Sequence, residues 1–133
     1  MIQENSVVMV SGSGEVALPL RRALHDAGVS VRVVRSCAET EEILNGLSVP
    51  SMLFCETSLP DGTWADILAL ASEAQTRIPV VVVSRLVDID LYINALEHGA
   101  ADFIVPPFCQ KDVSYVMSCA VQKNMAVQSP GAA

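Results

Sequence analysis

Short apolar runs alternate along the chain with longer segments in which apolar residues recur every three or four positions. Runs of this length that are rich in valine predict buried strands, and the longer segments predict amphipathic helices. A helix is expected after each strand, so the pattern indicates a parallel sheet covered by helices on both faces. The predicted strands are Val7 to Val10, Val29 to Val34, Ser51 to Cys55, Val80 to Val83 and Phe103 to Val105.

The helix ends can be placed from capping residues. Ser36 and Glu39 have the spacing of a capping box, and Thr63 can cap the following helix. Gly28 and Gly99 are expected to end the first and fourth helices. The residues expected to face the core are Val16, Leu20, Ala23, Leu24 and Ala27; Ile43, Leu44 and Leu47; Trp64, Ile67, Leu68 and Ala71; and Val113, Val116, Met117 and Ala120.

Five repeats of strand and helix predict one α/β domain with the flavodoxin-like doubly wound fold and strand order 2-1-3-4-5. This (βα)5 sandwich is expected to occupy residues 1–125. Residues 126–133 have the composition of a linker or a disordered tail.

Composition limits the classes of function. Of 133 residues, 51% are hydrophobic and 17% are charged, which indicates a large core and not a disordered chain. The net charge of −7 argues against nucleic-acid binding by this domain, because phosphate binding requires clustered lysine and arginine. We expect neither a membrane span nor a secretory signal, and therefore a cytoplasmic protein.

The cysteines and histidines do not have the spacing of metal ligands. The four cysteines form no C-x-x-C pair, and both histidines fall in predicted helices. We therefore expect no metal site, and we interpret the cysteines as buried thiols that act as small hydrophobes. The residues concerned are Cys37, Cys55, Cys109, Cys119, His25 and His98.

Three segments carry a more specific signal. The run from Met52 to Gly62 reads as a strand that ends in the carboxylate of Glu56, followed by a Leu-Pro-Asp-Gly turn. The second segment is a valine strand that ends in Ser84. The third runs from Gly99 to a Pro-Pro-Phe sequence that ends at Phe108. Together they resemble the receiver domain of two-component response regulators, and the resemblance extends from about residue 7 to about residue 125.

The resemblance implies a role for each position near the strand ends. In that family an aspartate four residues before the turn proline accepts a phosphoryl group, and here the position holds Glu56. An acidic pair that holds magnesium corresponds to Ser11 and Gly12. The switch hydroxyl corresponds to Ser84, and the switch aromatic residue corresponds to Phe103. The position of the family's lysine holds Pro106, and the peptide bond before Pro107 is expected to be cis.

The replaced residues remove most of the chemistry of phosphoryl transfer. That reaction requires a nucleophile in line, a divalent cation and a positively charged donor. Ser11 and Gly12 offer no carboxylate to magnesium, and Pro106 has no side-chain donor. We therefore expect no enzyme activity, no metal and no other cofactor. A residual phosphoryl acceptor at Asp61 or Ser84 remains an alternative.

Glu56 itself has two interpretations. As a phospho-mimic, its carboxylate would contact Ser84, Phe103 would be buried, and the domain would stay in one active-like state. Alternatively, Glu56 is a solvated carboxylate at a strand end, in a domain that is kept for its surface.

The resulting hypothesis is a pseudo-receiver, a regulatory domain of two-component signalling and transcription control that acts by protein contact without phosphorylation. The expected surface is formed by the fourth helix, fifth strand and fifth helix, and it would bind an effector or a second copy of the chain. Two alternatives are a small-molecule site in the crevice and an NADP-binding fold using Gly12-x-Gly14-x-x-Ala17 with Arg35. The residues expected on the contact face are Leu91, Tyr92, Ala95, Phe108, Tyr115, Val116 and Ser118.

Overall fold

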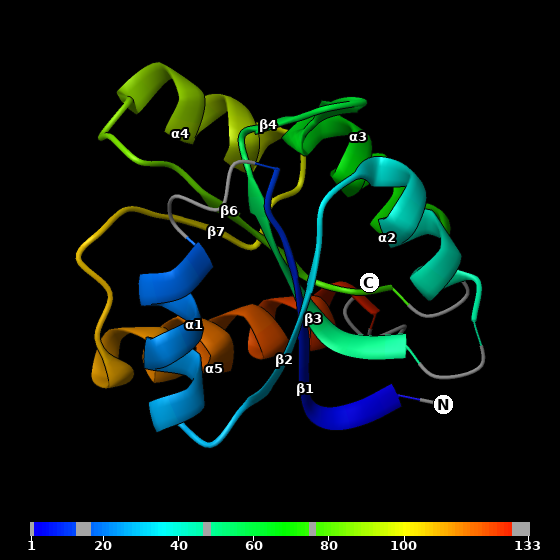
Figure 1. The fold of residues 1–133 in the computed structure, drawn as a ribbon. Coiled ribbons are helices and arrows are strands. Elements are labelled where there is room, and N and C mark those ends of the chain that lie inside the picture. The colour runs from blue at the N-terminus through cyan, green and yellow to red at the C-terminus, as the bar shows by residue number, and fades with distance from the viewer. Residues whose placement is uncertain (1, 13–16, 47–48, 75–76, 129–133) are drawn as a thin grey trace.

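The five predicted strands form one parallel sheet. The computed structural model describes residues 2–12, 17–46, 49–74 and 77–128. The order in the sheet is β2-β1-β3-β6-β7, which is the doubly wound order 2-1-3-4-5 when the long strands alone are counted (Figure 1). These strands are β1 (Ile2–Val10), β2 (Ser30–Val34), β3 (Val49–Glu56), β6 (Val80–Val83) and β7 (Asp102–Ile104).

Helices cover both faces of this sheet. Two of them lie together on one face, and the other three lie on the opposite face (Figure 1). The first pair is α1 (Ala17–Asp26) and α5 (Gln110–Gln128), and the other three are α2 (Cys37–Leu44), α3 (Trp64–Glu73) and α4 (Ile89–Glu97).

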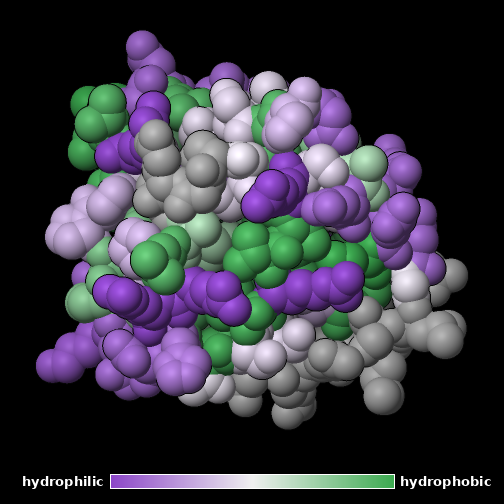
Figure 2. All heavy atoms as spheres, viewed as in Figure 1, coloured by the Kyte–Doolittle hydropathy of each residue, from purple (hydrophilic) through white to green (hydrophobic). Residues whose placement is uncertain are grey.

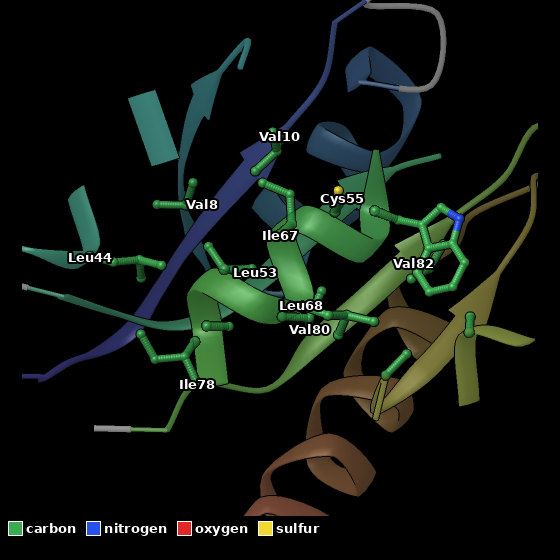
Figure 3. Close-up of a cluster of buried hydrophobic side chains, with 14 of the residues drawn as sticks. Val8, Val10, Leu44, Leu53, Cys55, Ile67, Leu68, Ile78, Val80 and Val82 are labelled. Atoms are coloured by element: carbon green, nitrogen blue, oxygen red, sulfur yellow. The ribbon is translucent and has the colours of Figure 1, made fainter. Parts of the chain in front are cut away.

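The core has two halves because successive strand residues point to opposite faces. Met9 and Phe54 pack with α1 and α5 on one side. On the other side, Leu53 and Val82 pack against α3, where Figure 3 shows Ile67 between strand side chains. Every side chain of β6 is buried, as expected for a central strand of a parallel sheet.

β1 is longer than the apolar pattern predicts. It begins at Ile2, and its residues Ile2 and Gln3 pair with the start of β3 before the register shifts ahead of Val7. The added part of the strand has the sequence Ile-Gln-Glu-Asn-Ser, and its four polar residues give no strand signal.

The helix ends agree with the predicted caps, with one difference. Thr63 forms a complete capping box with Asp66. The Ser36 hydroxyl accepts a hydrogen bond from the Glu39 amide at 3.2 Å, but the Glu39 carboxylate accepts from the amide of Arg35 at 2.6 Å instead of from that of Ser36. The box at α2 is therefore displaced by one residue.

Both predicted stop glycines have a left-handed backbone. Gly28 has φ of 80° and Gly99 has φ of 100°, a region that side chains disfavour. At the other end of the chain, α5 continues to Gln128 and so extends past residue 125, where a linker was predicted; residues 129–133 lie outside the described residues. No helix in the described part of the chain combines the length and apolarity that crossing a membrane requires.

The turn after β3 is itself ordered as a small hairpin. β4 (Ser58–Leu59) and β5 (Gly62–Thr63) pair antiparallel around Pro60 and Asp61. The Leu-Pro-Asp-Gly sequence predicts a turn here but not a hairpin. Its position decides what the neighbouring site can hold.

Candidate functional site

The candidate site lies at the carboxyl edge of the sheet. Ser11 follows β1, Glu56 ends β3 and Ser84 follows β6, and these three strands are neighbours. Val10 pairs with Cys55, and Glu56 pairs with Val83. All three polar side chains are buried, with 3% of Ser11 and 8% each of Glu56 and Ser84 exposed.

The burial of Glu56 contradicts one of its two interpretations. A solvated carboxylate would be exposed, whereas only 8% of Glu56 is exposed. Burying an ionised group is costly unless it has polar partners. Throughout the described residues, no buried side-chain nitrogen or oxygen lacks a hydrogen-bond partner. Glu56 is therefore packed and hydrogen-bonded within the carboxyl edge of the sheet.

The Ser84 hydroxyl makes a local turn. It donates a hydrogen bond to the carbonyl oxygen of Leu86 at 2.8 Å, and the Leu86 amide approaches the same hydroxyl at 3.4 Å. The backbone amide of Ser84 donates to the carbonyl of Ile104 on β7 at 3.0 Å. Since a hydroxyl has one proton, that proton goes to Leu86 and not to Glu56. The phospho-mimic interpretation requires a contact between Glu56 and the Ser84 hydroxyl, but this hydroxyl donates to Leu86 instead.

Phe103 is half-buried, and not fully buried as the phospho-mimic interpretation requires. Its ring meets the ring of Tyr92 edge to face, with the centroids 5.7 Å apart and the planes at 70°. This aromatic pair joins β7 to α4, so the switch aromatic position contacts the surface of the domain as well as its core.

The positions of the acidic pair do not fit magnesium. Neither Ser11 nor Gly12 has a carboxylate, and magnesium sites in proteins depend on carboxylate oxygens. A Cβ atom on Gly12 would lie 3.0 Å from Cδ of Pro60 in the β4–β5 hairpin. The described residues contain no group of three or more His, Cys, Asp or Glu side chains that could hold a metal. The hairpin thus occupies the space into which an acidic side chain would project.

The lysine position offers no replacement for the missing charge. Pro106 is exposed, and the Pro106–Pro107 peptide bond is cis. A proline side chain has no hydrogen-bond donor. No cation therefore comes from this position to stabilise a phosphoryl group.

Asp61, the alternative acceptor, is engaged elsewhere. Its carboxylate accepts hydrogen bonds from the amide of Cys37 at 2.8 Å and from that of Ala38 at 3.1 Å. These are free amides of the first turn of α2, where a negative charge is favoured. The hydrogen bond from the Cys37 amide, followed by that from Ala38, holds the pKa of Asp61 below its usual value. Asp61 therefore ties the hairpin to α2, a contact between residues 23 and 24 positions apart that no local pattern signals.

The exposure of the cysteines differs from the prediction, which was that all four are buried. Cys55 is buried, Cys37 and Cys119 are half-buried, and Cys109 is exposed. Burial is the main cause that raises the pKa of Cys37 to about 11, and burial likewise raises that of Cys55. The exposed thiol of Cys109 donates to the carboxylate of Asp112 at 3.1 Å.

The predicted contact face is partly wrong. Ala95 is fully buried and Val116 is 9% exposed, so both belong to the core; Leu91 and Phe108 are half-buried. Tyr92, Tyr115 and Ser118 are exposed, as expected. The rotation of a helix about its axis depends on its packing, which the spacing of apolar residues does not fix when both sides of the helix are apolar.

A group of exposed apolar residues was missed instead. These residues lie in the loop before α4 and along its outer side, and Figure 2 shows apolar side chains gathered at the upper left, where α4 begins. The missed residues are Leu86 (75% exposed), Val87 (77%), Ile89 (68%) and Ile93 (47%). The signal available in the sequence was the apolar pair that follows Ser84 outside any predicted strand.

Two hollows lined by described residues lie away from this edge. One of about 190 Å³ lies between α3 and the end of α4, and another of about 480 Å³ lies beside β2 and α2. Neither is lined by Glu56 or Ser84, so they give no support to a small-molecule site in the crevice. Of the glycine pattern considered for NADP, Gly14 lies outside the described residues.

Similar proteins are bacterial regulators. The luminescence regulatory protein LuxO of Vibrio campbellii is 28% identical over 104 residues, which are 78% of this chain and 22% of that protein. The swarming motility regulation protein RssB of Serratia marcescens is 29% identical over 121 residues, which are 91% of this chain and 54% of that protein. The chain thus spans about a fifth of one relative and about half of the other.

Solved structures share the fold. A response regulator receiver domain protein from Clostridium thermocellum has a TM-score of 0.75 at 18% identity, covering 92% of this chain and 98% of that one. The beryllofluoride-activated NtrC4 receiver domain dimer also has a TM-score of 0.75 at 18% identity, covering 90% of this chain and 98% of that one. Residues 7–117 match the response regulator receiver domain, and the chain therefore belongs to this family of signal-transduction domains.

Proposed function

We propose that this receiver domain transmits its signal by protein contact and does not accept a phosphoryl group. The observation that carries this proposal is the approach of Pro60 to Gly12, with 3.0 Å between the proline Cδ and a Cβ placed on the glycine. The acidic pair is therefore not merely substituted, because the hairpin lies tightly against the position where its side chain would begin. Without a magnesium ligand there, and without a donor at Pro106, the charge that develops in phosphoryl transfer has no stabilising partner.

The other candidate acceptors support the same conclusion. Both carboxylate oxygens of Asp61 accept hydrogen bonds from α2, and the Ser84 proton is donated to Leu86. A phosphoryl acceptor at either residue would first have to give up these contacts. The domain would therefore work as a pseudo-receiver, with its regulatory role residing in its surface.

Glu56 keeps one part of the phospho-mimic interpretation. It places a buried carboxylate at the acceptor position, but it brings one negative charge where a phosphorylated aspartate has nearly two. The Ser84 hydroxyl points to Leu86. We therefore assign Glu56 the role of a buried carboxyl group that stabilises one arrangement of the carboxyl edge, without the Ser84 switch.

The setting of the domain is proposed from its relatives. Both are named as regulatory proteins, and each is longer than the matched segment. We place the domain in the cytoplasm as the regulatory module of a signalling protein that controls transcription. Its contacts would use the side of the molecule formed by α4, β7 and α5, with an effector or a second copy as the partner and without direct binding to nucleic acid.

The test is phosphorylation itself. The purified domain is incubated with magnesium and acetyl phosphate and its intact mass is measured, and amide NMR spectra are recorded with and without magnesium and beryllofluoride. A receiver with a complete acceptor, acidic pair and lysine serves as the positive control. We expect no mass gain and unchanged spectra. A gain of one phosphoryl group, or saturable shifts around Glu56 and Ser84, would refute the proposal.

A further inference from the structure

A hollow of about 190 Å³ lies between α3 and the turn that follows α4, away from the carboxyl edge of the sheet. Its floor is apolar, because Leu68, Ile78 and Val80 line it and all three belong to the core. Figure 3 shows the side chains of Leu68 and Val80 next to each other. Sites for drug-sized ligands measure about 300–1,000 Å³. The hollow is smaller than that range, so it suits a small ligand with a short apolar part.

The ring of His98 lines the hollow and is held in a fixed orientation. It meets the ring of Trp64 edge to face, with the centroids 5.4 Å apart and the planes at 90°. Nδ1 lies 2.8 Å from the carbonyl oxygen of Asn94, and because a carbonyl has no proton, Nδ1 donates this hydrogen bond. In the neutral ring Nε2 then carries the lone pair. His98 therefore offers an acceptor to a ligand that has an N–H group.

Arg77 places a positive charge beside the same hollow. It is exposed, and it directly precedes Ile78 of the apolar floor. The chain has 8 lysine and arginine residues against 15 aspartate and glutamate residues, so this cation is not part of a generally basic surface. A guanidinium group binds a carboxylate through two parallel N–H···O hydrogen bonds. The hollow therefore combines a group that binds carboxylates, a hydrogen-bond acceptor and an apolar floor.

We propose that this hollow binds a small aliphatic α-amino acid such as valine or leucine. The carboxylate of the ligand binds Arg77, and its ammonium group donates to Nε2 of His98. The apolar side chain of the ligand lies against Leu68 and Ile78, where it is removed from water. Each part of the amino acid thus has a matching group among the residues that line the hollow.

The charge of the whole domain favours a zwitterion over a simple anion. The net charge of −7 repels anions, whereas an α-amino acid has no net charge and avoids this cost. The inference goes beyond the proposed function, because it gives the domain a signal other than phosphorylation. The hollow contains none of the residues at the carboxyl edge, so each proposal can fail without the other.

The test titrates the purified domain with L-leucine and with L-valine and records amide NMR spectra. We expect saturable shifts centred on the segments that line the hollow, which are residues 65–72, 77–80 and 98–99. Trp64 fluorescence gives a second reading, since its ring contacts that of His98. Absence of saturable shifts with both amino acids would refute the proposal.

Analogues of leucine test the three contacts one at a time. Leucine amide lacks the carboxylate, isocaproic acid lacks the ammonium group, and glycine lacks the apolar side chain. We expect each to bind about tenfold or more weakly than leucine, because each loses a hydrogen bond to a charged group or the apolar contact. Equal binding of leucine and isocaproic acid would overturn the proposal. Tighter binding of the peptide Gly-Gly-Leu would also overturn it, and would assign the hollow to the C-terminus of another protein.

Variants of the domain locate the site. Arg77→Gln removes the charge, and Ala69→Leu places a larger side chain in the lining of the hollow. Both residues are exposed, so the variants should fold, and each should weaken leucine binding by about tenfold or more. Ala38→Leu makes the matched change at an exposed position of α2 and should leave binding unchanged. The urea midpoint of each variant checks its folding, and unaltered affinity of folded Arg77→Gln and Ala69→Leu would overturn the proposal.

His98→Phe tests the acceptor separately. It keeps a ring that can contact Trp64 and removes Nε2, so it should weaken the binding of leucine but not that of isocaproic acid. An equal loss for both ligands would show that His98 acts only through packing, and would overturn the amino-acid assignment.

Discussion

The close approach of the β4–β5 hairpin to Gly12 leads to a quantitative prediction about stability. A Cβ atom on Gly12 would lie 3.0 Å from Pro60 Cδ and 3.6 Å from the Leu59 Cα and the Ser58 carbonyl oxygen. The first contact is tighter than ordinary van der Waals contact, so the neighbour must move by a few tenths of an ångström. A proline ring is bonded to its own backbone and cannot rotate away. The hairpin must therefore move as a unit when Gly12 is replaced by alanine.

Two opposing effects set the size of the change. Overpacking costs about 1–3 kcal/mol. Replacing glycine by alanine at a compatible backbone conformation stabilises by about 0.4–1 kcal/mol, because it restricts the unfolded chain. Gly12 is not in the left-handed region, so the second effect applies. We expect Gly12→Ala to lower the free energy of unfolding by roughly 0.5–2 kcal/mol.

Removing the proline ring should reverse the sign. In a Pro60→Ala background the clash is absent, and Gly12→Ala should then raise the free energy of unfolding by about 0.4–1 kcal/mol. The two substitutions should therefore be coupled by about 1–3 kcal/mol in a double-mutant cycle. Magnesium affinity plays no part in this cycle, so it tests the geometry of the closed site by itself.

Urea unfolding of the four proteins measures this coupling. Trp64 is the chain's one tryptophan and is 8% exposed, so its fluorescence reports the exposure of the segment beside the hairpin. The slope of free energy against urea should stay the same in all four proteins, since a changed slope would mean a changed unfolded state. If Gly12→Ala has the same effect with and without Pro60, the hairpin does not close the site, and the reasoning fails.

Two further predictions concern groups around the hairpin. Because the pKa of Asp61 is lower in the folded protein than its unfolded value of 3.8, the contribution of Asp61 to stability is present above pH 3.8 and is lost as the pH falls through the folded pKa. Asp61→Asn should therefore lower the urea midpoint at neutral pH and flatten the decline of the midpoint below about pH 5. Parallel curves of midpoint against pH for the two proteins would contradict this. Iodoacetamide at about pH 8 should alkylate exposed Cys109 before Cys37 or Cys55, because the thiolate is the reactive form and burial raises the pKa of Cys37 and Cys55. Peptide mass spectrometry gives the order of labelling. Early labelling of Cys55 would show that the edge of the sheet opens.

Local patterns in the sequence were sufficient for the sheet and most helix ends. Valine runs mark central strands because their side chains are buried on both faces, as all four are in β6. Thr63 and Gly99 act through neighbours within four residues, so their roles can be read directly. The start of β1 was missed because four of its first five residues are polar, and the strand is extended there by pairing with β3.

The sequence by itself determined which chemical groups stand at the strand ends, because the identity of a residue and its distance from a strand are local facts. Glu56, Ser11 and Pro106 could therefore be placed at the carboxyl edge in advance. Tertiary structure alone decided that Glu56 is buried, that Asp61 caps α2, and that Pro60 closes the space at Gly12. It also decided that Ile93 faces outward while Ala95 faces the core. These outcomes depend on contacts between distant segments and on helix rotation, and such contacts are set by packing of the whole domain.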